Sequence, residues 1–310
     1  MNQHDYMNIL FLNTTPNTGG AAIAASRIAK AVEKKGIHTD HLYRPENRIS
    51  FLRFLWERLI IFISNGFNRE KLFQVSIANT GCDISKLDVV QNADIIHIHW
   101  INQGFLSLTD IKKLIALRKP IVWTMHDMWP MTGICHHSWG CKRYQTQCGH
   151  CPFLHSNKES DLSTITWKKK QFMKDSKIQL VAVSSWLASL SKESSLTKDL
   201  DVKVIPNVID TTIFTPKNRN EMRNLHSLPT DKKIIVVGAA RLNDPIKGFE
   251  YLMKAIAILS QKRSDIFLIL FGGIKHDASF LSKIPIPYKY FGSLNDPSII
   301  SQIYSAADVT

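Results

Sequence analysis

Four of the five cysteines of the chain lie in the stretch HDMWPMTGICHHSWGCKRYQTQCGHCPF at 126–153. They are Cys135, Cys141, Cys148 and Cys151. Four thiolates form the ligand set of a tetrahedral metal site, and the closing C-x2-C knuckle is of the kind that zinc and iron favour. The first two gaps are wider than usual, so structural zinc, reduced thiols or a disulfide, and an iron–sulfur or redox centre all stay open. Three histidines of the stretch could replace a cysteine as ligand: His136, His137 and His150.

A second group of polar residues stands at the ends of two apolar runs. His97 and His99 alternate in ADIIHIHW (93–100), so their side chains share one face of a strand, and Trp100 follows them. His126 and Asp127 end the run PIVWTMHD. We predict that these groups converge, although a histidine satisfied by a neighbouring side chain is the alternative for any one of them.

Two further motifs could bind an anion. Gly19 and Gly20 stand between the first predicted strand and its helix, where the absent side chains leave helix N–H groups accessible. In RLNDPIKG, Arg241 follows a strand and Lys247 opens the next helix. A guanidinium and an ammonium beside a helix N-terminus suit a diphosphate. The alternative for the glycine pair is a simple tight turn, and the alternative for Arg241 and Lys247 is a pair of solvated surface cations.

The composition is that of a soluble globular protein, with 44% hydrophobic and 21% charged residues in a chain of 310. The net charge of +13 favours anionic partners: nucleic acid, an anionic bilayer surface or phosphorylated small molecules. The N-terminal residues lack the basic and apolar regions of a signal peptide. We therefore expect a cytoplasmic protein, in which clustered cysteines are reduced or bind metal.

The apolar stretch 49–67 contains three charged residues, too many for an unaided membrane span. At helical spacing it places four apolar side chains on one stripe: Phe51, Leu55, Leu59 and Phe62. The pattern fits a helix lying in a bilayer interface and fits an ordinary core-facing helix equally well.

Strands and helices alternate along the chain. Strands are predicted at 7–13, 93–100, 120–127, 178–185, 202–207, 234–242, 265–273 and 288–293. Helices are predicted at 18–36, 107–119, 247–262 and 297–308. Such alternation indicates doubly wound α/β domains with parallel sheets, whose ligands bind at the carboxyl ends of the strands. The pattern restarts after the polar stretch 206–233, which we interpret as a linker between domains 1–208, with a Cys-rich loop at 132–153, and 209–310.

In this order the elements resemble those of glycosyltransferase family 4, which has the GT-B fold of two Rossmann-like domains facing a cleft. The motifs are ILFLNTTPNTGGAAIAASRIAKAVEKKG, DIIHIHW, VWTMHDMWPMTG, AVSSWL, VIPNVIDTTIF, GAARLNDPIKGFEYLMKAIAIL and YFGSLNDPSIISQIYSAADV. The cysteine cluster is similar to that of the bacterial exopolysaccharide (colanic-acid-type) branch.

The resemblance implies a retaining hexosyltransferase of surface polysaccharide synthesis, with a UDP- or GDP-sugar as donor. It places Gly19 and Gly20 against the donor phosphates and the acceptor, and Arg241 and Lys247 on the donor diphosphate. It places His126, with Asp127, beside the transferred sugar, and three residues on the acceptor side of the cleft: His97, His99 and Trp100. No catalytic metal is implied, so a zinc ion on the cysteines would be structural.

Basicity further suggests a lipid-linked saccharide acceptor and work at the inner face of the cell membrane, with 49–67 as a peripheral contact. We expect no nucleic-acid partner. One departure concerns the second domain, because the Glu-x7-Glu region of the family does not occur in this sequence. The sequence thus predicts an incomplete second sheet, in which the strand IIVVGA is an exposed apolar edge, and little turnover by these 310 residues.

Two other classes of function are considered. The net charge and the cysteine cluster would also suit a zinc-dependent nucleic-acid-binding protein, but the cluster itself holds only Lys142 and Arg143 as cations. The polar group at the strand ends would suit a metal-dependent hydrolase with His97, His99, His126 and Asp127 as ligands.

Overall fold

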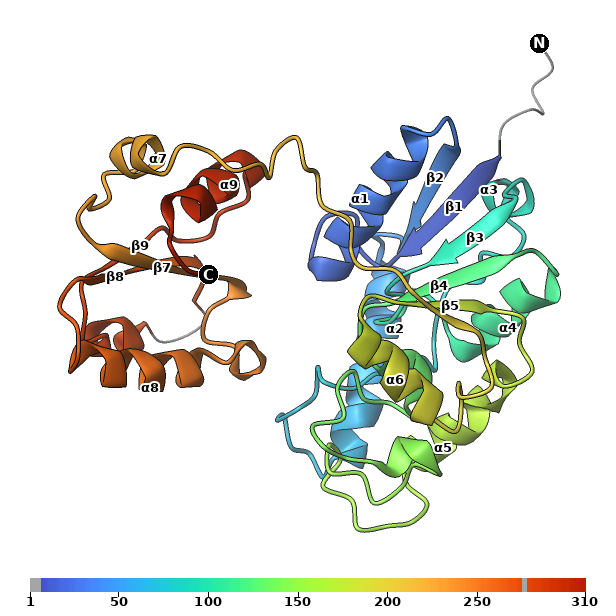
Figure 1. The fold of residues 1–310 in the computed structure, drawn as a ribbon. Helices are drawn as coiled ribbons and strands as arrows, with labels where there is room; N and C mark the ends of the chain where they lie inside the picture. The colour runs from blue at the N-terminus through green and yellow to red at the C-terminus, as the bar shows by residue number, and fades with distance from the viewer. Residues whose placement is uncertain (1–6, 275–277) are drawn as a thin grey trace. The chain divides into compact units, whose positions relative to one another are not determined.

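The computed structural model describes residues 7–274 and 278–310, and the chain divides into two compact units, Met1–Val208 and Ile209–Thr310 (Figure 1). Each unit has its own parallel sheet and its own hydrophobic clusters. Each therefore has the layered α/β build that alternating strands and helices predict.

In the described part of the first unit, six parallel strands form a sheet in the order β2-β1-β3-β4-β5-β6. The strands are β1 (Asn8–Asn13), β2 (His38–Tyr43), β3 (Ile95–Ile98), β4 (Ile121–Met125), β5 (Gln179–Ala182) and β6 (Val202–Val204). The α-helices are α1 (Gly20–Glu33), α2 (Arg48–Ser64), α3 (Asp88–Gln91), α4 (Leu108–Ala116), α5 (Leu162–Lys169) and α6 (Ser185–Glu193). Short 3₁₀ turns are η1 (Trp129–Met131), η2 (Arg143–Gln145) and η3 (Lys170–Met173).

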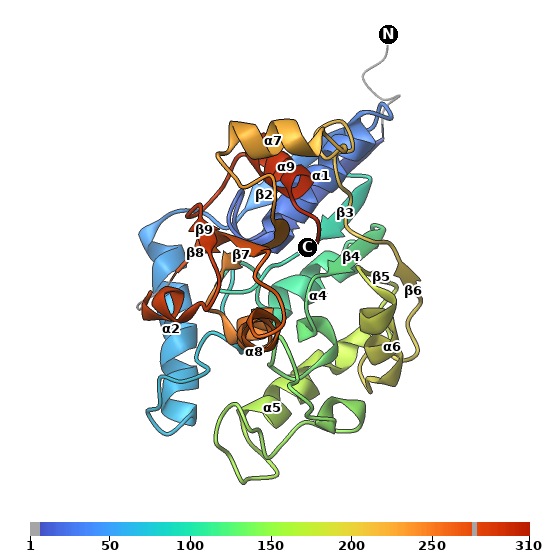
Figure 2. The same ribbon diagram turned by 60° about the vertical axis from the view of Figure 1, so that its left-hand side comes forward.

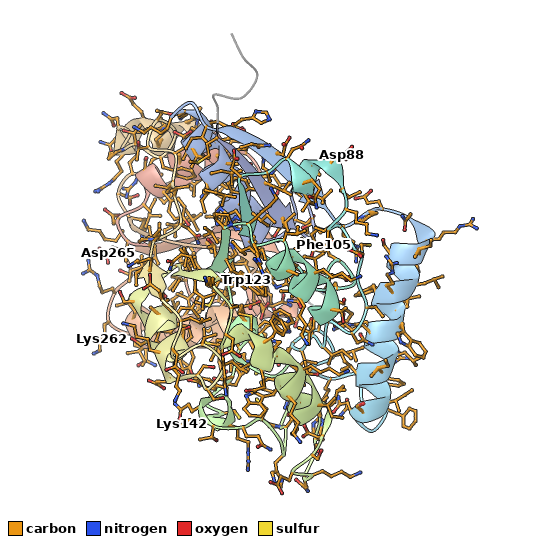
Figure 3. All side chains as sticks on the ribbon, turned by 90° about the vertical axis from the view of Figure 1, so that its right-hand side faces the viewer. Asp88, Phe105, Trp123, Lys142, Lys262 and Asp265 are labelled. Carbon is orange, nitrogen blue, oxygen red and sulfur yellow. The ribbon has the colours of Figure 1, made fainter. Side chains whose placement is uncertain are left out.

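Strand β1 shows how side-chain alternation divides the core of this unit. Leu10 and Leu12 face the main cluster, which includes side chains of α4, whereas Ile9 and Phe11 face α1 on the opposite side of the sheet. Figure 1 shows α1 lying along β1 and β2. In Figure 3 the label of Trp123, a buried residue of β4, lies among the packed side chains of the unit. A sheet covered on both faces explains why its central strands are continuous apolar runs.

Several helices of the first unit begin at side chains that accept a hydrogen bond from the first turn. Ser107 caps α4, Asp161 caps α5 and Ser184 caps α6. Helix α1 differs, because it begins at Gly19 with φ at 91° and without a side-chain cap. Its first backbone N–H groups are therefore open to another acceptor.

Helix α2 buries charged side chains and exposes apolar ones. Glu57 Oε1 accepts hydrogen bonds from the backbone N–H groups of Ile77 (2.8 Å) and Ala78 (2.9 Å), and Arg58 Nη2 lies 3.0 Å from Glu57 Oε2. Large apolar side chains of the same helix are exposed: Ile49, Phe51, Leu52, Leu55, Trp56, Leu59 and Ile63. In Figures 2 and 3 the helix, drawn in light blue, stands at the margin of the first unit. Three of the four residues of the predicted apolar stripe are exposed, so this stripe does not face the core.

The described part of the second unit has three parallel strands in the order β7-β8-β9, which are β7 (Lys233–Arg241), β8 (Ile266–Gly273) and β9 (Tyr288–Tyr290). Its helices are α7 (Arg219–Leu225), α8 (Phe249–Ser260) and α9 (Pro297–Ala306), with 3₁₀ turns η4 (Pro245–Lys247) and η5 (Ser279–Lys283). The order is that of the first three strands of a Rossmann sheet. None of the helices described in either unit is long and apolar enough to span a bilayer.

Two expectations for the second unit are wrong in part. The polar stretch 206–233 contains α7, which packs on α9, so it is more than a linker. The outer edge of β7 does not lie fully open, because Ile235 pairs with Val309 in parallel. Asp308 fixes this pairing, since its Oδ2 accepts from the Ile234 N–H at 2.8 Å and lies 2.7 Å from Arg223 Nη2.

Candidate active site

The carboxyl edge of the first sheet gathers three histidines from two neighbouring strands. His97 and His99 share a face of β3, with their ring centroids 4.3 Å apart, and both rings contact Phe11 of β1. His126 follows β4, and its ring stacks on His99 at 5.2 Å. Parallel strands thus bring together the three rings that the sequence places at strand ends.

Hydrogen bonds fix the orientation of these rings. His99 Nδ1 lies 2.9 Å from His126 Nε2, and His97 Nε2 lies 2.8 Å from Thr124 Oγ1. The other ring nitrogen of His99, Nε2, is buried without a hydrogen-bond partner among the described residues. One nitrogen of the His99–His126 pair must carry the hydrogen, so each ring determines the tautomer of the other.

Burial keeps the three rings neutral at physiological pH. Loss of solvation, together with the neighbouring His126, lowers the pKa of His97 to about 4. Loss of solvation likewise lowers the pKa of His126 to about 4, against an opposing effect of Asp127. The pKa of His99 lies well below its usual value, because of burial first and of the adjacent His97 and His126 next. The group can therefore donate or accept hydrogen bonds without carrying charge.

The carboxylate of Asp127 holds the loop after β4. Its Oδ2 accepts from His136 Nδ1 at 2.6 Å and from Trp100 Nε1 at 2.9 Å, and its Oδ1 accepts from the Trp129 N–H at 2.8 Å. Burial alone would raise the pKa of Asp127, but His136 and these hydrogen bonds outweigh it and lower the pKa. These bonds tie the carboxylate to its own loop and to Trp100. The carboxylate is thus occupied in holding this loop, and among the described residues no metal-binding group includes it.

The glycine turn after β1 is exposed and open. A side chain added at Gly19 or Gly20 would meet no heavy atom within 4 Å. Gly19 adopts a φ of 91°, which L side chains rarely adopt, and α1 has no acidic residue in its first turn. An anion can therefore approach the first N–H groups of α1.

The two predicted phosphate-binding cations lie in the second unit. Arg241 is the last residue of β7 and Lys247 ends η4, one residue before Gly248 opens α8. Both side chains are exposed. Gly272 of β8 permits the close approach of the two strand ends, since a Cβ there would lie 1.9 Å from the carbonyl oxygen of Ala239. The structure thus presents both cations at the carboxyl end of a strand.

The four clustered cysteines are free thiols that line one small cavity of about 20 Å³. Among the described residues, no three His, Cys, Asp or Glu side chains are already arranged to hold a metal ion. Burial raises the pKa of Cys135 to about 12, of Cys148 to about 11 and of Cys151 to about 12. These three thiols are therefore protonated in this structure.

Three residues at or near the site have no assigned role in the sequence-based prediction. Thr14 Oγ1 donates to the carbonyl oxygens of Trp100 (3.0 Å) and Asn102 (2.8 Å), which ties the ends of β1 and β3 together. Thr124 orients His97, and the buried Lys170 donates to carbonyl oxygens of the loop after β4. For Thr124 a signal exists, since it lies two residues before His126 on the same strand. For Thr14 and Lys170 the sequence pattern contains no signal that points to these contacts.

Two Rossmann-like units define the GT-B class of glycosyltransferase folds. Solved structures of similar fold include trehalose-6-phosphate synthase OtsA, at a TM-score of 0.56 and 11% identity, covering 97% of this chain and 77% of that one. A UDP-forming trehalose-phosphate synthase of Burkholderia xenovorans gives 0.53 and 12%, covering 97% and 76%. An Escherichia coli trehalose-6-phosphate protein bound with UDP-2-fluoro glucose gives 0.52 and 12%, covering 97% and 77%. At these identities the likeness establishes the fold alone.

The family model of glycosyltransferase family 4 matches residues 18–213. This is more than half of the chain, and the chain belongs to that family. The colanic acid biosynthesis glycosyl transferase WcaC of Escherichia coli strain K12 is 34% identical over 172 residues. The match spans 48% of this chain and 40% of WcaC.

Proposed function

We propose that this chain is a glycosyltransferase that moves a hexose from a nucleotide sugar to a lipid-linked saccharide, with retained anomeric configuration, in surface polysaccharide synthesis. Membership of family 4 and the similarity to WcaC support this class of reaction. The observation that carries the proposal is the contact between His99 and His126. It holds a neutral imidazole in one orientation at the sheet edge where α/β sheets bind ligands.

The proposed donor is a UDP- or GDP-sugar, and one solved structure of the same fold was bound with UDP-2-fluoro glucose. As the bond to the sugar breaks, negative charge develops on the departing diphosphate. Arg241 and Lys247 stabilise that charge, the first through paired hydrogen bonds and the second as a point charge. Because side chains supply the positive charge, we propose a catalytic step without a metal ion.

His126 acts as a neutral hydrogen-bond donor to the transferred sugar. An orphaned buried N–H group is rarer than an orphaned lone pair, so the unpartnered Nε2 of His99 is assigned the lone pair. His99 then carries its hydrogen on Nδ1 and donates it to His126 Nε2. His126 is left with its hydrogen on Nδ1, and Asp127 keeps the loop in place. His97, which Thr124 orients, and Trp100 belong to the acceptor side.

The glycine turn completes the first-unit part of the site. Since no side chain stands over Gly19 and Gly20, a phosphate oxygen can reach the N–H groups that open α1. A phosphate of the donor and a phosphate of the lipid-linked acceptor could each use these N–H groups, because either must come close to the backbone.

The lipid-linked acceptor brings the enzyme to the inner face of the cell membrane, where α2 contacts the bilayer. The exposed apolar side chains of α2 are flanked by Arg48, which begins the helix, and by Arg69, which follows its end. The buried Glu57–Arg58 pair turns the charged side of the helix inward and leaves the apolar side outward. Apolar side chains with flanking cations suit an anionic lipid surface.

Transfer is tested by incubating the protein with UDP- and GDP-hexoses labelled in the sugar and with diphosphate-linked lipid saccharides in vesicles. We expect low turnover by these 310 residues, and a labelled lipid product whose new linkage has the anomeric configuration of the donor, as read by NMR. A product of inverted configuration would contradict retention. Failure of both UDP and GDP to bind in a calorimetric titration would contradict the donor assignment.

The membrane contact is tested by flotation with phosphatidylglycerol vesicles. The variant Leu52→Asn with Trp56→Ser should lose most of its binding, because each substitution removes an exposed apolar side chain of α2. Trp186→Ser is the matched control, since Trp186 is 62% exposed, against 54% for Trp56, but lies on α6. Equal flotation of both variants and the unsubstituted protein would exclude α2 as the contact.

A further inference from the structure

We propose that Cys135, Cys141, Cys148 and Cys151 bind one structural Zn²⁺ ion. The first ground is geometry, because all four residues line the same cavity. Its volume of about 20 Å³ is enough for a single water-sized occupant. Three of the four cysteines are buried, and every one has a free thiol. Four thiols that line one ion-sized space supply the ligand set of a structural zinc site.

The second ground is the knuckle at Cys148-x2-Cys151, which is held in shape before any ion binds. His150 has a φ of 44° and so makes the turn, while the Cys151 N–H donates to the Asp161 carboxylate at 2.8 Å. The Leu154 N–H donates to the Cys151 carbonyl oxygen at 3.0 Å, so hydrogen bonds fix the backbone on both sides of this cysteine.

The third ground is the tight packing behind Cys148. The Gly133 N–H donates to Cys148 Sγ at 3.3 Å, and a Cβ at Gly133 would lie 3.1 Å from that sulfur. A Cβ at 133 would also lie 2.6 Å from the Ser163 carbonyl oxygen, so glycine is needed for the chain to pass this close behind Cys148.

The fourth ground is a buried cation beside the thiols. Lys170 is 1% exposed, and its Nζ donates to the carbonyl oxygens of Trp129 (2.6 Å) and Thr132 (3.0 Å). Thr132 precedes Gly133, whose N–H contacts Cys148 Sγ, so the Lys170 ammonium lies close to the thiol cluster. A buried ammonium is unfavourable unless it is paired, and a zinc ion with four thiolates carries two negative charges. Lys170 thus stands where such a site requires a countercharge.

Binding replaces four S–H bonds by four Zn–S bonds and releases four protons. Among the described residues the thiols are not already arranged around one ion, so binding requires them to move. The ion has no part in sugar transfer. The ion would link the two ends of the loop 135–151. Cys135 directly precedes His136, whose Nδ1 lies 2.6 Å from Asp127 Oδ2.

The test is the metal content of the whole chain purified after expression with added zinc. We expect about one Zn per chain by plasma mass spectrometry, and Co²⁺ substitution should give the absorption bands of a tetrahedral tetrathiolate. Cys141→Ser and Cys148→Ser should each lose most of the metal. Cys82→Ser, which replaces the fifth cysteine, is the control and should keep it.

A variant that fails to fold leaves the unsubstituted protein as the decisive sample. Titration with a mercurial should release the zinc as the cluster thiols react. Zinc absent after purification and after refolding with Zn²⁺ would overturn the proposal. So would zinc retained by both serine variants, disulfides among the four cysteines by mass spectrometry, or the visible spectrum of an iron–sulfur cluster. None of these readouts depends on transferase activity, so the zinc site and the proposed function can fail separately.

Discussion

The candidate ligand-binding residues of the two units differ in their burial and in whether their side chains contact one another. In the first unit, His97, His99 and His126 contact one another and are largely withdrawn from water. In the second unit, Arg241 and Lys247 are exposed at the end of a strand. Desolvated neutral rings keep one hydrogen-bond geometry, whereas exposed cations keep full charge and adjust to a flexible diphosphate. In the proposed reaction the first unit therefore supplies orientation and the second supplies charge.

The largest expected effect separates these two roles. His126→Ala should lower kcat by about 10²–10³-fold, as found when one donor to a transition-state oxygen is removed. Nucleotide affinity should change little, because the cations assigned to the diphosphate are unaltered. Initial rates of sugar transfer and calorimetry with UDP or GDP measure both quantities. The control is His38→Ala, an exposed histidine of the same sheet. Weaker nucleotide binding with unchanged kcat would reverse the assignment.

The next effect concerns charge in the second unit. Arg241→Ala and Lys247→Ala should each weaken nucleotide binding about 10- to 100-fold, the range for one lost charge-assisted hydrogen bond. The remaining affinity should also depend less on salt, since one exposed cation has been removed. Calorimetric titrations at low and high salt measure this effect. Lys262→Ala is the matched control, because Lys262 is exposed on the same unit (Figure 3). Equal affinities for all three variants would exclude the diphosphate site.

A smaller effect follows from the neutral histidines. Burial lowers the pKa of His97 and His126 from 6.5 to about 4. Between these values the unfolded chain binds more protons than the folded one, so the free energy of unfolding falls as the pH falls. The slope is up to ~1.4 kcal/mol per pH unit for each histidine, and it disappears above pH ~6.5.

Urea unfolding between about pH 7 and about pH 4.5 measures this slope. His97→Gln should reduce the slope of the free energy of unfolding against pH by the contribution of one histidine. His38→Ala, at an exposed position, should leave this slope nearly unchanged. An identical slope in His97→Gln would show that this ring is not buried in its neutral form.

The smallest effect tests the open turn of the first unit. Gly19→Ala should destabilise the fold by about 1–2 kcal/mol, because φ at 91° is unfavourable for a residue with a Cβ. Gly20→Ala should instead stabilise it by about 0.4–1 kcal/mol, since Gly20 lies in α1 with open space around it. Thermal unfolding of the two variants measures the difference. Effects of the same sign would contradict the left-handed turn at Gly19.

Much of the fold can be predicted from the sequence, because a strand that is buried on both faces of the sheet has a continuous apolar sequence. Strands β1, β3, β4 and β8 lie within the predicted runs. The exception is β2, which lies at the edge of the sheet and reads HTDHLY, without an apolar run. An edge strand needs less apolar surface, so its sequence carries less of the signal.

Helix α2 shows what periodicity leaves open. A stripe of apolar residues at helical spacing predicts a helix with two faces, but it does not say which face is covered. In the structure Glu57 is buried because two backbone N–H groups and Arg58 satisfy it, and the apolar face stays outside. Those partners lie 20 and 21 residues along the chain at Ile77 and Ala78, beyond the reach of a local pattern.

The sequence by itself determined which chemistry is present at each strand end: histidines after β3 and β4, glycines after β1, and a cation after β7. It did so because residue type and strand position are local properties. Tertiary structure alone decided how those groups are used. It turned Asp127 toward His136 and Trp100, joined His99 to His126, and placed Lys170 beside the thiols. Each of these contacts joins separate turns of the chain, and only packing of the whole unit decides which polar groups meet when water is excluded.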